Sequence, residues 1–158
     1  MSHLYVANWK MTMPFAQALE FVKAHKKQLH ELAMYPKTQV VICPSFPALF
    51  PMADMLKDTM LNVGAQTCSA YAHGAYTGQV SAQSIKQAGA CFCIVGHSET
   101  RHYYNQFPEE IGAQVARLLE QDIHPIICLG ETQEEHTEKE TCAVLEEQLN
   151  GVLPALIE

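Results

Sequence analysis

The sequence predicts an α/β fold with a parallel sheet, built from five consecutive βα units. Short apolar runs bounded by turn residues alternate with longer stretches in which apolar residues recur at helical spacing. Such an alternation requires parallel strands that are joined by right-handed crossovers. Two architectures fit this order, an open doubly wound sheet or part of a (β/α)8 barrel, and periodicity does not choose between them.

The predicted strands have the composition of strands that helices cover on both faces, because few polar residues interrupt them. We expect each of them to be buried. They are Leu4–Trp9, Gln39–Cys43, Leu61–Gly64, Cys91–Gly96 and Pro125–Leu129.

Each predicted strand is followed by a stretch with one apolar stripe, which indicates a helix packed on the sheet. After the third strand, Ser81 is a candidate N-cap and Gly89 a candidate C′ residue. We interpret the acidic stretch from Glu131 to Glu147 as the solvated face of the last helix, with an acidic interaction tail as the alternative. The stripes consist of Phe15, Leu19 and Val22; Leu49, Met52, Ala53 and Leu56; Ile85; Ile111, Val115, Leu118 and Leu119; and Cys142, Leu145, Leu149 and Val152.

Composition limits the classes of protein to which the chain can belong. It has 158 residues, 48% of them hydrophobic, and a net charge of −7, which fits a single domain over residues 1–158. The negative charge argues against a nucleic-acid partner. No apolar run approaches the roughly 20 residues of a membrane span, so no membrane partner is expected. The stretch Met1–Val6 lacks the pattern of a secretory signal, and we therefore expect a cytoplasmic protein.

The cysteine pattern indicates reduced, structural thiols rather than a metal site or a redox module. No C-x-x-C pair occurs among them, and no paired histidine ligands follow. The sequence also lacks a G-x-G-x-x-G motif and a P-loop, so neither a metal nor a cofactor is predicted. The six cysteines are Cys43, Cys68, Cys91, Cys93, Cys128 and Cys142.

Two residues at the predicted C-terminal strand ends stand out, and functional residues of both architectures gather at that edge. Lys10 can point into a cleft and meet an anion, or it can be a solvated loop lysine. His97 follows a buried run and a glycine, and Ser98 and Glu99 can open a short helix after it. The positive end of such a helix favours the neutral imidazole, which can donate a hydrogen bond to a carbonyl oxygen. A satisfied structural histidine is the alternative.

Taken together, five strand-end motifs resemble the triosephosphate isomerase family, in its order and at its spacings. The resemblance covers the chain from its N-terminus to about Gln148. It implies a (β/α)8 TIM barrel, represented here by an incomplete barrel of about five βα units. The motifs are Asn8-Trp9-Lys10-Met11, Val63-Gly64-Ala65-Gln66, Gly74-Ala75-Tyr76-Thr77-Gly78, Ile94-Val95-Gly96-His97-Ser98-Glu99 and Ile127-Cys128-Leu129-Gly130-Glu131-Thr132.

The resemblance implies an activity, the interconversion of dihydroxyacetone phosphate and glyceraldehyde 3-phosphate in glycolysis and gluconeogenesis. In that reaction His97 would be the neutral electrophile that polarises the carbonyl, a role for which the family is the known example. Lys10 would be the cation that meets the substrate's phosphate and its developing negative charge. Asn8 would hydrogen-bond a substrate oxygen, and Glu99 would support the site by contacting Lys10.

The resemblance also implies supporting residues and a homodimer. Ser98, Cys128 and Glu131 would support the site. The loop from Gln66 to Gly78, with Tyr76 and Thr77, would project into a second subunit, where Thr77 reaches towards the active site. The implied partners are therefore the triose phosphate and a second copy of the chain.

The family's general base has no counterpart among these residues. A (β/α)8 barrel has eight strands and about 250 residues, whereas five units are recognisable here. In the family, the next unit carries the catalytic Glu and the lid, and the last units cradle the phosphate. Glu131 matches a different family position. Because proton abstraction needs a base within hydrogen-bond reach, we expect the chain alone to have little or no isomerase activity.

A non-enzymatic hypothesis competes with the isomerase. The unpaired edges of the first and fifth strands and an uncovered apolar layer would favour association. In that case the chain is a self-associating α/β scaffold, and the active-site residues are relics.

Overall fold

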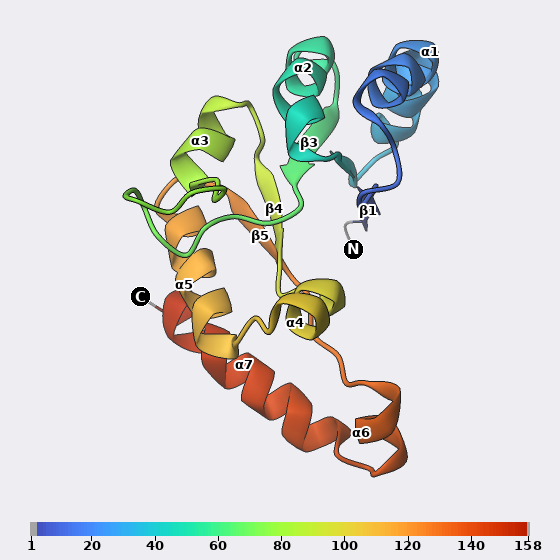
Figure 1. Cartoon of the computed structure of the whole chain (residues 1–158). Helices are drawn as coiled ribbons and strands as arrows, with labels where there is room; N and C mark the ends of the chain where they lie inside the picture. The colour runs from blue at the N-terminus through green and yellow to red at the C-terminus, as the bar shows by residue number, and fades with distance from the viewer. Residues whose placement is uncertain (1–2, 158) are drawn as a thin grey trace. The chain divides into compact units, whose positions relative to one another are not determined.

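The computed structural model describes residues 3–157 and contains five strands and seven helices in this range (Figure 1). One helix follows each of the first three strands, and two follow each of the last two. Met1 and Ser2, which belong to the stretch predicted to lack a signal, and Glu158 lie outside the described residues. The strands are β1 His3–Asn8, β2 Thr38–Cys43, β3 Leu61–Ala65, β4 Phe92–Val95 and β5 His124–Ile127. The helices are α1 Phe15–Ala33, α2 Phe46–Leu56, α3 Ala82–Gln87, α4 Ser98–Tyr104, α5 Pro108–Leu119, α6 Gln133–Thr137 and α7 Thr141–Ile157.

The strands follow one another in the order β1-β2-β3-β4-β5, which confirms the predicted succession of βα units. β1 and β2 run parallel in register from His3 opposite Thr38 to Asn8 opposite Cys43. β2 and β3, and β3 and β4, are also parallel pairs. The chain divides into two compact units, Met1–Thr67 with Gln83–Cys93 and Cys68–Ala82 with Ile94–Glu158, so that β4 contributes to both.

In the first unit, α1 and α2 pack against β2 and β3. The α2 stripe is confirmed, since Leu49, Met52 and Leu56 are buried. The helix starts where Ser45 precedes Phe46-Pro47, because a proline is tolerated in the first turn of a helix.

Strand β1 is not buried as predicted, and β5 is only half-buried, with His124 exposed. Leu4, Tyr5 and Val6 are 48%, 60% and 37% exposed. The prediction was wrong because an apolar run indicates a strand but not its place in the sheet. β1 comes first in the strand order and has one hydrogen-bonded neighbour, β2.

In the second unit, α5 and α7 pack against each other (Figure 1). A Cβ atom on Gly112 would lie 2.1 Å from the carbonyl oxygen of Gly151, so the helix backbones approach closely. Val152 of α7 is fully buried, whereas Leu149 and Leu153 beside it are 39% and 42% exposed. The predicted stripe is therefore confirmed at Val152 and wrong at Cys142 and Leu149, which are exposed.

The acidic stretch belongs to two helices, which corrects the single helix predicted there. Thr132 starts α6 with a capping box, in which its side chain accepts from the Glu135 N–H and the Glu135 carboxylate accepts from the Thr132 N–H. Lys139 then takes a positive φ of 65°, which ends the turn before α7 begins. No helix within residues 3–157 is long and apolar enough to cross a membrane.

Candidate active site

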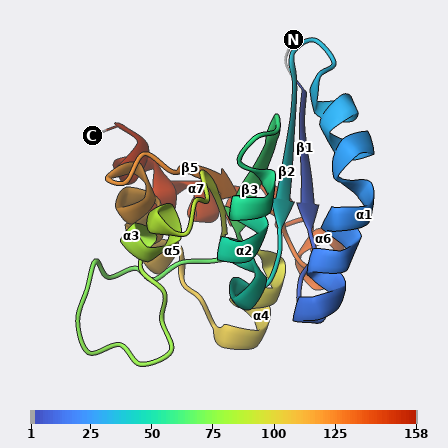
Figure 2. The same cartoon turned by 90° about the horizontal axis from the view of Figure 1, so that it is seen from above.

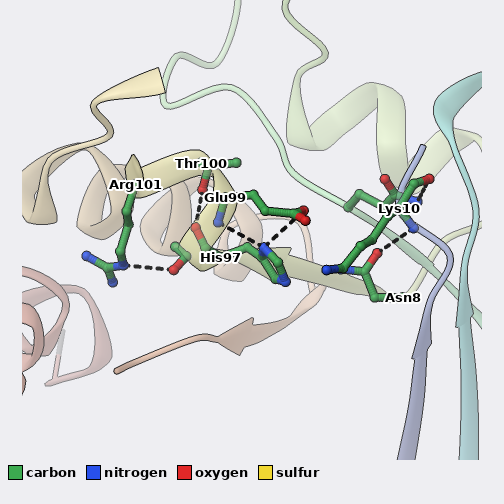
Figure 3. A network of polar contacts seen from close by, with 8 residues as sticks. Asn8, Lys10, His97, Glu99, Thr100 and Arg101 are labelled. Atoms are coloured by element: carbon green, nitrogen blue, oxygen red, sulfur yellow. Dashed lines mark hydrogen bonds and ion pairs between the residues drawn. The ribbon is translucent and has the colours of Figure 1, made fainter. Parts of the chain in front are cut away.

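The loop after β1 holds Lys10 in an unusual backbone conformation. Its φ is +50°, a left-handed value that few residues other than glycine adopt. The Lys10 N–H donates to Asn8 Oδ1 at 2.9 Å, so the side chain predicted to bind substrate also shapes this turn (Figure 3). Thr12 Oγ1 donates to the Trp9 carbonyl at 2.7 Å and closes the turn from the other side. Strained backbone of this kind is concentrated at functional sites.

Gln66, which follows β3, ties this loop to two strand ends. Its Nε2 donates to the Lys10 carbonyl and to the Cys43 carbonyl, each at 2.9 Å. The Trp9 N–H donates to the same Cys43 oxygen at 3.0 Å. The resemblance places Gln66 in the dimer loop and does not predict these bonds. A contact between residues 56 positions apart leaves no local sequence signal.

In the second unit, His97 caps the predicted short helix, α4. Its Nδ1 accepts a hydrogen bond from the Glu99 N–H at 3.2 Å (Figure 3). A nitrogen that accepts carries no proton, so the neutral ring has its proton on Nε2 and offers it as a donor. The Glu99 carboxylate lies 3.4 Å from the same Nδ1, with Oε2 as the nearer oxygen. The bond from the Glu99 N–H is the shorter of the two contacts, and a backbone N–H can only donate. We therefore assign this bond, and not the carboxylate contact, as the one that sets the tautomer of His97.

Arg101, which the sequence patterns did not single out, joins the ends of β4 and β5. Its Nε donates to the Gly96 carbonyl at 2.8 Å, and its Nη2 donates to the Cys128 carbonyl at 3.1 Å. Burial lowers the pKa of the Arg101 guanidinium. Gly96 has a φ of +65°, and a Cβ atom there would lie 2.7 Å from Arg101 Nη2. The Arg101 side chain is half-buried.

Several predicted residues line cavities beside His97. A cavity of about 200 Å³ is lined by Gly96, His97, Ser98, Arg101, Cys128, Leu129, Gly130 and Glu131. A second hollow of about 450 Å³ brings Ser98, Glu99 and Glu131 together with Arg101. The structure therefore gathers His97, Ser98, Glu99, Cys128 and Glu131 in one unit, and Asn8, Lys10 and Gln66 in the other.

Cys128 and Glu131 have environments that fit supporting roles. Burial raises the pKa of the Cys128 thiol, which keeps it protonated and unreactive. Glu131 Oε1 lies 3.0 Å from His136 Nδ1 and accepts from Thr141 Oγ1 at 3.3 Å. Hydrogen bonds from its own backbone and from His136 lower the pKa of Glu131, so it is a weaker base than an ordinary carboxylate.

The loop after β3 projects as a long excursion (Figure 2) and is exposed from Tyr71 to Gln79. Its neck is closed by the Ser69 N–H, which donates to the Val80 carbonyl at 2.8 Å. Near its tip, Tyr71 and Tyr76 stack with ring centroids 3.9 Å apart and planes 4° from parallel. Thr77 and Gly78 follow this stack and are exposed.

The described residues contain no group of three or more His, Cys, Asp or Glu side chains arranged to hold a metal ion. The polar groups at the two strand-end sites are instead hydrogen-bond donors and charged side chains. Such an arrangement can bind an anion and polarise a carbonyl oxygen.

Comparison with known proteins identifies the family. The family model of triosephosphate isomerase matches residues 3–158. The triosephosphate isomerase of Endomicrobium trichonymphae is 35% identical over 153 residues, which are 97% of this chain and 60% of the relative. That of Aquifex aeolicus is 34% identical over 159 residues and covers all of this chain and 63% of the relative.

A solved structure agrees with the sequence comparison. The crystal structure of the Bartonella henselae triosephosphate isomerase matches with a TM-score of 0.88 at 30% identity, over 96% of this chain and 62% of that one. The chain thus spans about 60% of the length of the curated relatives that it matches. Its five strands, its strand-end residues and these matches together show that the chain belongs to the triosephosphate isomerase family.

Proposed function

We propose that the chain carries the electrophilic and cationic part of a triose-phosphate isomerase site. The observation that supports this most is the His97 ring, whose Nδ1 accepts from the Glu99 N–H and whose Nε2 is thereby left as a donor. A neutral donor can polarise a substrate carbonyl without carrying a full positive charge. The substrates would be dihydroxyacetone phosphate and glyceraldehyde 3-phosphate, interconverted through an enediolate.

Lys10 would meet the phosphate and the negative charge that develops on the substrate oxygens. Its left-handed backbone and the bond from its N–H to Asn8 fix where its side chain leaves the loop. A cation that is already positioned stabilises the transition state more than one that must first be ordered. Asn8 would hydrogen-bond a substrate oxygen, and Glu99 would contact Lys10.

We assign no general base within residues 3–157. Glu131 faces the His97 cavity, but its oxygen is engaged by His136 and Thr141 and its pKa is lowered. A general base needs a basic atom that is not already engaged, and it works best with a pKa near the working pH. We therefore propose that the 158-residue chain binds substrate and polarises it but does not complete proton transfer.

The family's homodimer is part of the proposal, as is a cytoplasmic location. The exposed loop from Gln66 to Gly78, with Tyr76 and Thr77 near its tip, is the segment that would enter a second copy. We also propose that the two units form one incomplete barrel domain over residues 1–158.

Binding of dihydroxyacetone phosphate tests the proposed site. In the ¹⁵N-labelled chain, titration should shift the signals of Lys10 and His97, and Lys10→Met should weaken binding at least tenfold. Lys27→Met is the matched control, because Lys27 is an exposed lysine of α1 outside the site. Equal affinities for the two variants would contradict the assignment of Lys10.

The self-associating scaffold is the second candidate, and the exposure of β1 favours it. Leu4, Tyr5 and Val6 present apolar surface on an edge strand, which invites pairing with another chain. Sedimentation of the chain at several concentrations separates the two proposals. A closed dimer fits the isomerase, whereas growth without a limit fits edge pairing.

A further inference from the structure

Arg101 has contacts that a surface arginine would not need. Its half-buried guanidinium makes its hydrogen bonds to two main-chain carbonyls, those of Gly96 and Cys128, at 2.8 and 3.1 Å. Within residues 3–157 it forms no ion pair with a carboxylate. Removing a guanidinium from water has a cost, which two carbonyl acceptors offset only in a fixed geometry.

The Gly96 carbonyl belongs to the peptide bond that enters His97. Arg101 Nε therefore fixes the plane of that peptide from one side. On the other side, Thr100 Oγ1 donates to the carbonyl of His97 itself at 2.8 Å. Gly96 has no Cβ atom, which leaves room for the guanidinium, since a Cβ there would lie 2.7 Å from Arg101 Nη2. Its φ of +65° is a left-handed value that also favours glycine.

The second bond of Arg101 fixes this turn to the neighbouring strand. The Cys128 carbonyl lies at the end of β5, and the Cys128 N–H donates to the Val95 carbonyl of β4 at 3.0 Å. The guanidinium and the backbone bond thus join the same two strand ends. His97 and Arg101 line the same cavity of about 200 Å³.

From these contacts we infer that Arg101 is the positioning residue for His97. It holds the Gly96–His97 turn so that His97 Nδ1 meets the Glu99 N–H and the ring presents its Nε2 proton. A planar guanidinium reaches two carbonyls at once, which a lysine ammonium on a flexible stem does not. The inference rests on the proposed role of His97 as electrophile.

The test reads the tautomer of His97 from its ring nitrogens by NMR, at about pH 8, where an ordinary histidine is neutral. His97→Gln identifies its signals among the 8 histidines. In Arg101→Met we expect the ratio of Nε2–H to Nδ1–H tautomer to fall by about 2- to 12-fold, the range that one hydrogen bond accounts for. Arg101→Lys should show a smaller fall. The matched control is Arg117→Met, which removes an arginine whose partner is Glu120 on the same unit.

Thermal unfolding of each variant separates positioning from general stability. A purely structural Arg101 would lower the melting temperature and leave the tautomer ratio of the folded chain unchanged, which would overturn the inference. An equal change in Arg117→Met would also overturn it. If Arg101→Met does not fold, the tautomer ratio of His97 in Arg101→Lys alone tests the inference. An unchanged ratio in that variant would overturn it. A wild-type His97 with its proton on Nδ1 would contradict both the proposed electrophile and the role of Arg101.

Discussion

Replacing Gln66 tests the account of the Lys10 loop. Gln66→Met keeps the length of the side chain and removes the donor that serves the Lys10 and Cys43 carbonyls. The bond to Lys10 is exposed, so water replaces it at a loss of about 0.5 kcal/mol. The bond to Cys43 is part-buried, and its loss costs about 1–1.5 kcal/mol, although the Trp9 N–H still serves that oxygen. We therefore expect the free energy of unfolding to fall by about 1.5–2 kcal/mol.

Urea unfolding measures this loss through the fluorescence of Trp9, the single tryptophan of the sequence. Trp9 adjoins Lys10, so its signal also reports a change in the loop before unfolding begins. Gln39→Met is the matched control, since Gln39 is an exposed glutamine of β2 in the same unit. Equal midpoints and slopes for Gln66→Met and Gln39→Met would refute the role of Gln66 in holding the Lys10 loop.

Gln66→Glu adds a pH dependence of known sign. A carboxylate placed against two carbonyl oxygens favours its protonated form, so its pKa rises in the folded state. Stability is then highest below the unfolded pKa of a glutamate and is lost as the pH rises through the folded pKa. The variant should approach Gln66→Met in stability at low pH and fall below it at neutral pH.

Three further predictions follow from single contacts. Gly96→Ala forces a left-handed alanine against the neighbouring arginine and should cost about 1–3 kcal/mol in thermal unfolding, whereas no loss would contradict the strained turn. Burial raises the pKa of Cys43 to about 12, so a thiol reagent at about pH 8 should label exposed Cys142 and leave Cys43 unmodified until the chain unfolds. Tyr71→Ala removes the stack with Tyr76 and should speed amide exchange in the loop by about 2- to 12-fold, whereas Tyr71→Phe should not.

The order of strands and helices was predictable because apolar runs and helical stripes are local patterns. Burial was less predictable, as β1 shows: Leu4 and Tyr5 read as core residues, yet an edge strand has one neighbour. The predicted stripe of α7 failed at Cys142 and Leu149 for a similar reason, because a stripe indicates which residues share a face but not what covers that face. The helix at Gln133–Thr137 was not predicted, although Thr132 and Glu135 have the spacing of a capping box, because the whole acidic stretch was assigned to one helix.

The residues of the candidate site also differ in whether a local sequence pattern marks them. His97 could be predicted because a buried run, a glycine and a helix start are adjacent in the sequence. Gln66 and Arg101 act through side-chain bonds to distant carbonyls, 56 and 27 positions away at the farthest, and such bonds have no periodic or local pattern. Roles that depend on tertiary contacts of this kind emerge only from the structure.

The most direct test of the central claim is an assay of the purified 158-residue chain for isomerisation of glyceraldehyde 3-phosphate, with His97→Gln beside it. We propose that His97 and Lys10 supply the electrophile and the cation and that no residue of the described chain supplies the general base. We predict no rate above buffer for either chain. Turnover that disappears in His97→Gln would contradict the claim, because a base would then be supplied from within this chain or by a neighbouring copy.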